Sequence, residues 1–250
     1  MSQPLPHDGI KPFADSQKSK KEQVAEMFDR IANRYDFMNR FLSLRIDLQW
    51  RKKAIATLNK ENPQHILDVA TGTGDLALMA FHQLQPQKIT GIDISEGMLA
   101  VGREKIAAKG LQDKIILTTC DAETINFTDN SFDAVMVAFG VRNFENLEAG
   151  LQEMLRVLKP GGKIMVLEFS KPHWPLFSAF YNWYMKSLAP ALAGSFGTNK
   201  EAYAYLNRSS NAFPNREAFT SLLHKAGYIN THFEPLTFGI CCIYTGSKPI

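Results

Sequence analysis

The feature that most constrains the fold is the regular alternation of short apolar segments with amphipathic segments between residues 64 and 170. The apolar segments predict five strands, at 65–70, 88–94, 114–120, 132–140 and 163–170, and helix patterns lie at 74–84, 96–110 and 146–158. Apolar runs of this kind, separated by helices, are typical of parallel strands buried on both faces. The chain is therefore predicted to form an α/β fold around a parallel sheet.

The sequence pattern divides the chain into three parts. Residues 1–17 carry Pro, Gly and Asp without periodicity and are expected to form a loose arm. Helical spacing continues over 18–62, with a break expected near Ser43, so this part is predicted to be an N-terminal helical extension. The α/β domain is expected over 63–250, and two closing strands are expected to meet near Gly239.

A glycine-rich turn follows the first predicted strand, in the stretch DVATGTGD. Gly72, Gly74 and Ala77 formally fit the G-x-G-x-x-A fingerprint of dinucleotide-binding proteins. Glycines at such a turn let a ligand approach the backbone closely and permit left-handed dihedral angles. A nicotinamide dehydrogenase, another nucleotide binder and a ligand-free tight turn would all produce this pattern, so the turn alone does not decide between them.

Acidic residues follow the second and third predicted strands, at the edge where open parallel sheets bind ligands. Asp93 lies about twenty residues beyond the glycines, the position at which a carboxylate typically accepts hydrogen bonds from ribose hydroxyls in nucleotide-binding proteins. The alternative is a helix cap, for which Ser95 is the better candidate. Asp121 can accept a hydrogen bond from an exocyclic amine such as that of adenine, and the N–H of Ala122 can donate to a ring nitrogen. The alternative for Asp121 is an ordinary turn residue.

The charges around the glycines argue against a dinucleotide. Asp68 and Asp75 lie where a pyrophosphate would sit, and the two acids at the strand ends would repel a 2′-phosphate. The acids at the strand ends thus provide for one nucleoside, and no group is evident that would bind a pyrophosphate. A cationic adenosyl ligand fits better, and S-adenosylmethionine carries both a sulfonium and an amino group.

Several motifs together resemble the class I S-adenosylmethionine-dependent methyltransferases, and more narrowly the ubiquinone/menaquinone biosynthesis C-methyltransferase family. The specific motifs are YDFMNRFLSL, AFGVRNF and LKPGGKIMVLEFSKP, and the resemblance runs from about Lys21 to the C-terminus. It implies a Rossmann-like, twisted seven-stranded sheet whose last strand is antiparallel. It also implies methyl transfer to a ring carbon of a prenylated quinol, most closely demethylmenaquinol. A benzoquinol, another hydrophobic phenol or sterol, and non-enzymatic cofactor binding are the alternatives.

The resemblance also implies cofactor-binding positions in the chain. They are Gly72, Thr73 and Gly74 in the glycine loop, Asp93 at the ribose, and Asp121 with Ala122 at the adenine. The chain departs from many relatives at three positions. Arg45 and Asp47 replace a glycine and a histidine, and Ala138 stands where some relatives have a serine, so the contact of that hydroxyl is not expected. Because arginine adopts glycine's dihedral angles less freely, a different turn is expected at Arg45.

The expected chemistry requires a nucleophilic ring carbon, which forms when the quinol hydroxyl loses its proton. Arg142 is predicted to stabilise the resulting oxyanion and Asn143 to orient the ring oxygen. The alternatives are an ion pair between Arg142 and a surface acid such as Glu145, and a helix-capping role for Asn143. Asp36 and His173 are the candidate bases.

Two further segments are expected to enclose the site. Tyr35, Asp36 and Asn39 belong to the helical extension, which is predicted to fold over the site as a lid that excludes water, with plain helix packing as the alternative. The aromatic segment from Trp174 to Phe196 is expected to bind the isoprenoid tail and to meet a membrane interface. Its alternative is a helix that covers the sheet.

Composition excludes several other classes of protein. The net charge is only +3, whereas nucleic-acid binders usually concentrate basic residues into a patch. The basic run Lys18 to Lys21 is expected to be a solvated helix start, and the alternative is that it binds an anionic lipid or another polyanion. Three cysteines, two of them adjacent, suggest neither a disulfide framework nor a metal site. Without a signal core or an apolar span, a cytoplasmic protein is expected, and peripheral membrane contact and a homodimer are compatible with the sequence.

Overall fold

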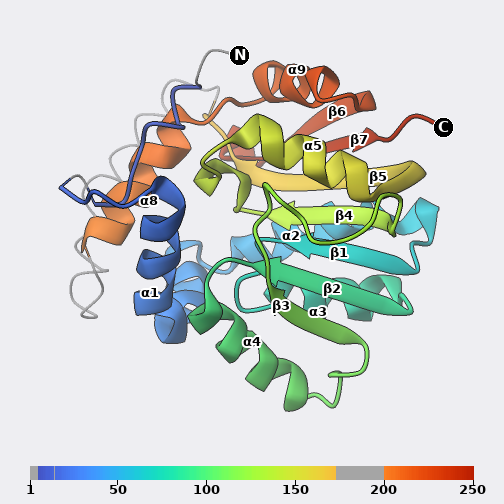
Figure 1. Ribbon diagram of the computed structural model, residues 1–250, viewed down its shortest axis with the longest axis horizontal. Helices are drawn as coiled ribbons and strands as arrows, with labels where there is room; N and C mark the ends of the chain where they lie inside the picture. Colours follow the sequence, from blue (N-terminus) through green and yellow to red (C-terminus); the bar gives the residue numbers. More distant parts are fainter. Residues whose placement is uncertain (1–4, 14, 173–199) are drawn as a thin grey trace.

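The computed structural model describes residues 5–13, 15–172 and 200–250. Within them, seven strands form one sheet in the order β3-β2-β1-β4-β5-β7-β6 (Figure 1). The strands are β1 (His65–Val69), β2 (Lys88–Asp93), β3 (Ile115–Thr119), β4 (Phe132–Ala138), β5 (Leu158–Phe169), β6 (Ile229–Leu236) and β7 (Cys241–Ser247). The first five are parallel, and β7 runs antiparallel to both β5 and β6. The predicted sheet with its antiparallel closing strand is confirmed.

Helices cover both faces of the sheet, as the apolar strands require. The helices after the strands are α3 (Asp75–Leu84), α4 (Glu96–Ala107), α5 (Leu147–Val157), α8 (Lys200–Ala212) and α9 (Glu217–Lys225). Strand β4 shows how the two layers are separated, because successive side chains point to opposite faces. Val135 and Val137 pack with α5 and α9, whereas Ala134 and Met136 pack with α3 and with the N-terminal helix α2 (Ile46–Ala56).

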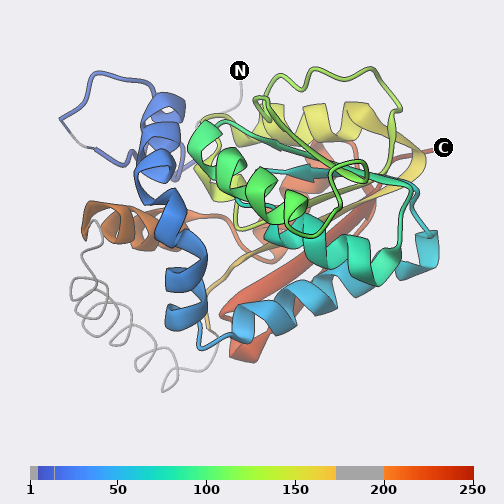
Figure 2. The same cartoon turned by 90° about the horizontal axis from the view of Figure 1, so that it is seen from below.

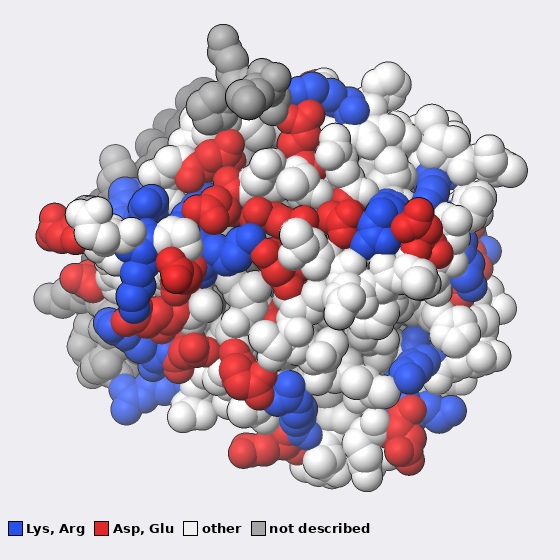
Figure 3. Space-filling view, viewed as in Figure 1, with Lys and Arg blue, Asp and Glu red and all other residues white. Residues whose placement is uncertain are grey.

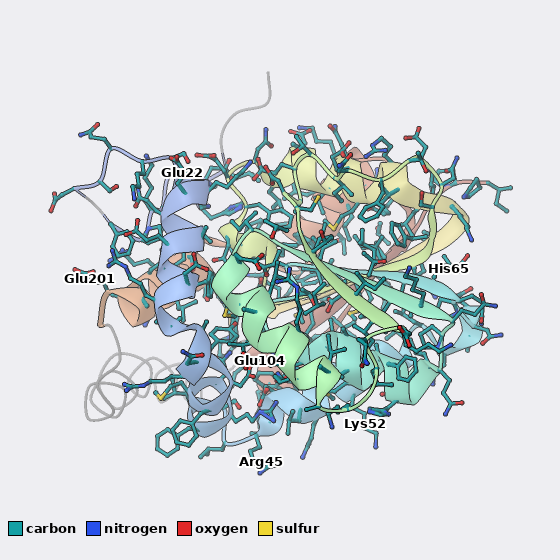
Figure 4. The ribbon with its side chains drawn as sticks, turned by 60° about the horizontal axis from the view of Figure 1, so that its bottom comes forward. Glu22, Arg45, Lys52, His65, Glu104 and Glu201 are labelled. Atoms are coloured by element: carbon teal, nitrogen blue, oxygen red, sulfur yellow. The ribbon has the colours of Figure 1, made fainter. Side chains whose placement is uncertain are left out.

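The order of the strands creates the crevice in which the site lies. The chain leaves β1 for β2 and β3 on one side, and then returns to place β4 on the other side of β1. Ligands of open α/β sheets bind at the carboxyl ends of the strands beside such a switch point. Helices α1 (Lys20–Leu42) and α8 stand side by side at that end (Figures 1 and 2). Figure 4 shows His65, where β1 starts, at the opposite end from Glu22 on α1 and Glu201 on α8.

Helix α1 begins with a capping box. The Ser19 hydroxyl accepts a hydrogen bond from the N–H of Glu22, and the Glu22 carboxylate accepts one from the N–H of Ser19. The helix ends at Leu42, close to the predicted break, and three residues separate it from α2. Arg45 in this turn has φ of 64°, so it does adopt the left-handed conformation. The arginine therefore does not exclude the conformation that a glycine would favour there.

The arm before α1 packs against the rest of the molecule over residues 5–13. His7 is fully buried, with its ring centroid 5.3 Å from that of Phe213. The N–H of Phe13 donates to Gln23 on α1 at 2.9 Å. Arg208 on α8 donates to the carbonyl of Lys11 at 3.3 Å. The arm thus joins α1 to α8.

No helix among the residues described combines the length and apolar character needed to cross a bilayer. On the face drawn in Figure 3, acidic and basic side chains are interspersed, and neither sign covers a large area.

Candidate active site

A pocket lies at the carboxyl ends of β1 to β4, with about 660 Å³ of space including its open mouth. This size suits a ligand such as a nucleoside derivative. Among the predicted site residues, those that line it are Gly72, Asp93, Asp121, Ala122 and Asn143. Helix α1 forms one wall through Lys21, Val24, Phe28 and Tyr35.

The glycine loop approaches the pocket through backbone. Gly72 has φ of 56°, and a Cβ atom there would lie 3.1 Å from the Met98 side chain. A larger residue would therefore be strained and would narrow the pocket. Gly74 is also left-handed, at φ of 74°, and is the cap residue directly before α3. Below the loop, the Thr71 hydroxyl donates to Asp68 at 2.6 Å, and burial raises the pKa of Asp68 to about 7.

Asp93 is held rigidly at the tip of β2. One carboxylate oxygen accepts the N–H of Gly72 at 2.8 Å, and the other accepts the N–H of Ser95 at 2.9 Å. Ser95 in turn caps α4 by accepting the N–H of Met98 at 3.2 Å, so the predicted cap is confirmed. Burial raises the pKa of Asp93, and the two N–H donors oppose this shift. Each oxygen keeps a lone pair with which it can accept a ribose hydroxyl.

Asp121 at the tip of β3 pairs with the basic run at the start of α1. One of its oxygens accepts the N–H of Glu123 at 2.9 Å, and the other accepts from Lys21. Lys20 is buried and donates to the carbonyls of His7 and Phe144, at 2.9 and 2.8 Å. The expectation of a solvated run was wrong for these two lysines, because each has partners brought close by the tertiary fold.

Thr73 turns away from the pocket and toward α1. Its hydroxyl donates to Asp36 at 2.6 Å and lies 3.2 Å from the ammonium group of Lys105. Lys105 also pairs with Asp36, at 2.8 Å, and with Asp75. Arg40 of α1 forms a further ion pair with Asp75. Ala70 and Gly72 are the members of this loop that line the pocket.

Arg142 forms a buried ion pair across two strand tips. It lies in the short helix η2 (Val141–Asn143) and donates to Glu168 at 2.7 Å and to the carbonyl of Phe139 at 2.6 Å. Neither side chain of the pair is more than 2% exposed. The alternative of a surface acid was wrong, since Glu145 accepts the N–H of Lys20 instead. Burial raises the pKa of Glu168, and Arg142 opposes this shift.

Asn143 faces a tyrosine from a distant helix. Its side-chain oxygen lies 3.2 Å from the hydroxyl of Tyr205 on α8. The alternative of helix capping was wrong, because Asn146 caps α5. Tyr35 from α1 completes this wall; burial raises the pKa of its hydroxyl, and Arg142 and Arg51 oppose the rise. Tyr205, Glu168 and Arg51 were not anticipated, although an acid within the apolar LEFS run marked Glu168 as unusual.

The comparisons with known proteins agree with this geometry. The ubiE/COQ5 methyltransferase family matches residues 16–248. The chain belongs to this family. It is 46% identical to a demethylmenaquinone methyltransferase of Bacteroides fragilis over 97% of this chain and 99% of the relative. It is 44% identical to the ubiquinone/menaquinone biosynthesis C-methyltransferase UbiE of Geobacter sulfurreducens, over 92% of this chain and 90% of the relative.

Solved structures of low identity show the same fold. Phosphoethanolamine N-methyltransferase 2 of Haemonchus contortus, in complex with S-adenosyl-L-methionine, aligns with a TM-score of 0.59 at 19% identity, over 79% of this chain and 52% of that chain. The [4+2]-cyclase SpnF aligns with a TM-score of 0.61 at 20% identity, over 92% and 96% of the two chains. The ubiE/COQ5 family thus shares its sheet with proteins of diverse activities, and its chemistry depends on its own side chains.

Of the two candidate bases, only Asp36 belongs to the described residues. Asp36 hydrogen-bonds to Thr73 and Lys105 and does not line the pocket. His173 and the aromatic segment 174–196 lie outside the described residues. Ala138, the position at which the serine hydroxyl contact was not expected, lines the pocket. The part of the chain that the structure covers contains no group of His, Cys, Asp or Glu that could hold a metal ion.

Proposed function

We propose that this chain transfers a methyl group from S-adenosylmethionine to a ring carbon of a prenylated quinol, most closely demethylmenaquinol. The observation that carries the proposal is the convergence on one pocket of two carboxylates, Asp93 and Asp121, with Asn143 and the Arg142 loop. A nucleoside and an oxygen-bearing ring would then meet at the switch point of the sheet. The names of the relatives support the quinol as acceptor.

The donor fits the residues of the first three strand tips. Asp93 would accept the ribose hydroxyls, and Asp121 with the N–H of Ala122 would read the adenine edge. Gly72 leaves room for close approach of the ligand to its backbone, where a side chain would meet Met98. The bound donor supplies an electrophilic sulfonium methyl group. What remains for the protein is to orient the acceptor and to favour loss of its hydroxyl proton.

The acceptor would lie against the tip of β4. Asn143 can donate a hydrogen bond from its side-chain NH₂ to a ring oxygen, because its side-chain oxygen already accepts from the Tyr205 hydroxyl at 3.2 Å and the amide is thereby oriented. The charge of Arg142 favours the phenolate form of the ring, even though Glu168 offsets part of it. A benzoquinol would present the same two oxygens, so it remains the alternative acceptor.

Helix α1 would act as the lid of the donor site. Three of its side chains, spaced by eight and seven residues, reach three different strand tips. Lys21 pairs with Asp121 after β3, Asp29 accepts from the hydroxyl of Ser95 at 2.6 Å, and Asp36 accepts from Thr73. Spacings of about two turns place these residues along one side of the helix. Release of the donor would therefore require α1 to give up polar contacts with each loop.

An exposed apolar rim supports contact with a membrane that carries the quinol. Leu44 is 77% exposed, Phe238 is 60% exposed and Phe37 is 57% exposed. The hydrogen bond from Trp50 on α2 to Thr237, at 2.8 Å, joins the segment after α1 to the loop that contains Phe238. Replacing Leu44 and Phe238 by serine should weaken vesicle flotation without loss of methyl transfer to a short-tailed quinol. Equal flotation of both proteins would contradict this membrane contact.

The deciding experiment uses methyl-labelled S-adenosylmethionine with demethylmenaquinol, a demethylated benzoquinol and a tail-less phenol. Label in menaquinol at the highest rate is the expected result. Preferential labelling of the benzoquinol would assign the alternative acceptor. Tight binding of the donor with no label in any acceptor would instead indicate a non-enzymatic binder.

A further inference from the structure

Arg51 is a buried cation with unused hydrogen-bond donors. It lies on α2, and its side chain is only 9% exposed. Its Nε is buried without a hydrogen-bond partner, and no N–H of this guanidinium donates a hydrogen bond to any described residue. An arginine has five N–H donors, and burying them unpaired is costly. Such a group indicates an anionic ligand.

The neighbours of Arg51 satisfy its charge only in part. Asp47, one turn earlier on α2, lies 3.6 Å from Nε, which is beyond a hydrogen bond. One oxygen of Asp47 is already taken by the hydroxyl of Ser43 at 2.6 Å. The guanidinium carbon lies 5.4 Å from the ring centroid of Phe139. Phe139 follows β4 and lines the pocket, so Arg51 lies beside the pocket at this strand tip.

The other cations at the described part of the site already have carboxylate partners. Lys21 pairs with Asp121 and, at 3.3 Å, with Glu123, at the adenine end. Arg142 pairs with Glu168 at 2.7 Å. Arg51 differs from both, because its paired carboxylate, that of Asp47, lies beyond hydrogen-bond distance and none of its N–H groups donates to a described residue.

The positive charge of Arg51 changes the pKa values of groups around the inner end of the pocket. It lowers the pKa values of the Tyr35 hydroxyl and the Asp68 carboxyl against the larger effect of burial, which raises both. Tyr35 lines the pocket, and Asp68 lies on β1 just before the glycine loop. Arg51 therefore acts where the tips of β1 and β4 meet.

We propose that Arg51 binds the carboxylate of the amino-acid end of S-adenosylmethionine. This inference rests on the proposed function. Asp93 and Asp121 would hold the adenosine over β2 and β3, which leaves the amino-acid end over β1 and β4, beside Arg51. A guanidinium matches a carboxylate in shape, and such charge-assisted hydrogen bonds are strong. A phenolate oxygen of the acceptor is the other anion that could occupy the same position.

The test compares S-adenosylmethionine with decarboxylated S-adenosylmethionine, which lacks only this carboxylate, by calorimetry. The wild-type protein should prefer the carboxylated donor by roughly 10- to 100-fold. In Arg51→Gln this preference should fall to about 1, while the affinity for the decarboxylated donor changes by less than roughly threefold. Lys53→Gln, on the same helix and exposed, is the matched control and should keep the preference.

A second variant tests the same contact in the opposite direction. Asp47→Asn removes the nearby acid that competes for Arg51, so it should strengthen binding of the carboxylated donor and not of the decarboxylated one. Equal weakening of both donors by Arg51→Gln would assign Arg51 a merely structural role and overturn the proposal. Loss of turnover with the preference intact would assign it to the acceptor oxygen, which also overturns it. A wild-type protein that binds neither donor would overturn the proposed function as well.

Discussion

The Arg142 guanidinium and the Glu168 carboxylate form an ion pair of 2.7 Å that is almost completely shielded from solvent. The pair joins the loop after β4 to the end of β5, and it leaves Nε of Arg142 and one oxygen of Glu168 without hydrogen-bond partners. Removing one member of such a pair leaves an uncompensated buried charge, whereas removing both does not. This difference allows the structural and catalytic contributions of Arg142 to be separated.

Arg142→Met should destabilise the fold by about 3 to 5 kcal/mol, because Glu168 then lacks its counter-charge. Adding Glu168→Gln should recover most of this free energy of unfolding, measured in urea. Methyl transfer should stay low in both variants, because the oxyanion has lost its cation. Recovery of turnover together with stability in the double variant would mean that Arg142 serves only the fold.

Asp93→Asn should weaken binding of S-adenosylmethionine by at least about tenfold, measured by calorimetry, with little change in fold. The amide keeps the shape of the carboxylate, but its NH₂ group would face the N–H of Gly72 or Ser95, which also donates. Glu96→Gln is the matched control, because this acid does not line the pocket and pairs with Arg103 on the exposed side of α4. Equal affinities in the two variants would remove Asp93 from the donor site.

Asp36→Asn should speed dissociation of the donor by about three- to tenfold, because it weakens the contacts of α1 with Thr73 and Lys105. Stopped-flow measurement of donor release checks this rate. Glu26→Gln is the control on the exposed side of the same helix, where Glu26 pairs with Lys18 and Arg30. If both variants release the donor at the wild-type rate, α1 does not limit its exchange.

His7 should make the fold sensitive to acid. Burial lowers its pKa from 6.5 to about 4, so the folded state keeps it neutral while the unfolded state binds a proton below about pH 6.5. The contribution of His7 to stability is therefore greatest above pH 6.5, and it falls by up to about 3 kcal/mol as the pH drops toward 4. His7→Phe, which retains a ring beside Phe213, should abolish this part of the pH dependence. Denaturation at pH 7 and 4.5 measures the difference, and parallel losses in both proteins would contradict the prediction.

Much of the site could be predicted because it depends on local position. A residue that directly follows a parallel strand lies at the carboxyl edge of the sheet wherever the rest of the chain goes. Gly72, Asp93, Asp121, Ala122 and Asn143 follow this rule, and all of them line the pocket. The roles of these residues with the donor and the acceptor stay predictions.

By itself, the sequence determined the strands and their burial on both faces, the glycine turn and the family, because these depend on periodicity and on motifs within a few residues. Only the tertiary structure decided the partners of the charged groups. Lys21 meets Asp121 one hundred residues away, and Arg142 chooses Glu168 over the neighbouring Glu145. Burial and long-range contact set the energy of a charge, and neither can be read from the residues beside it.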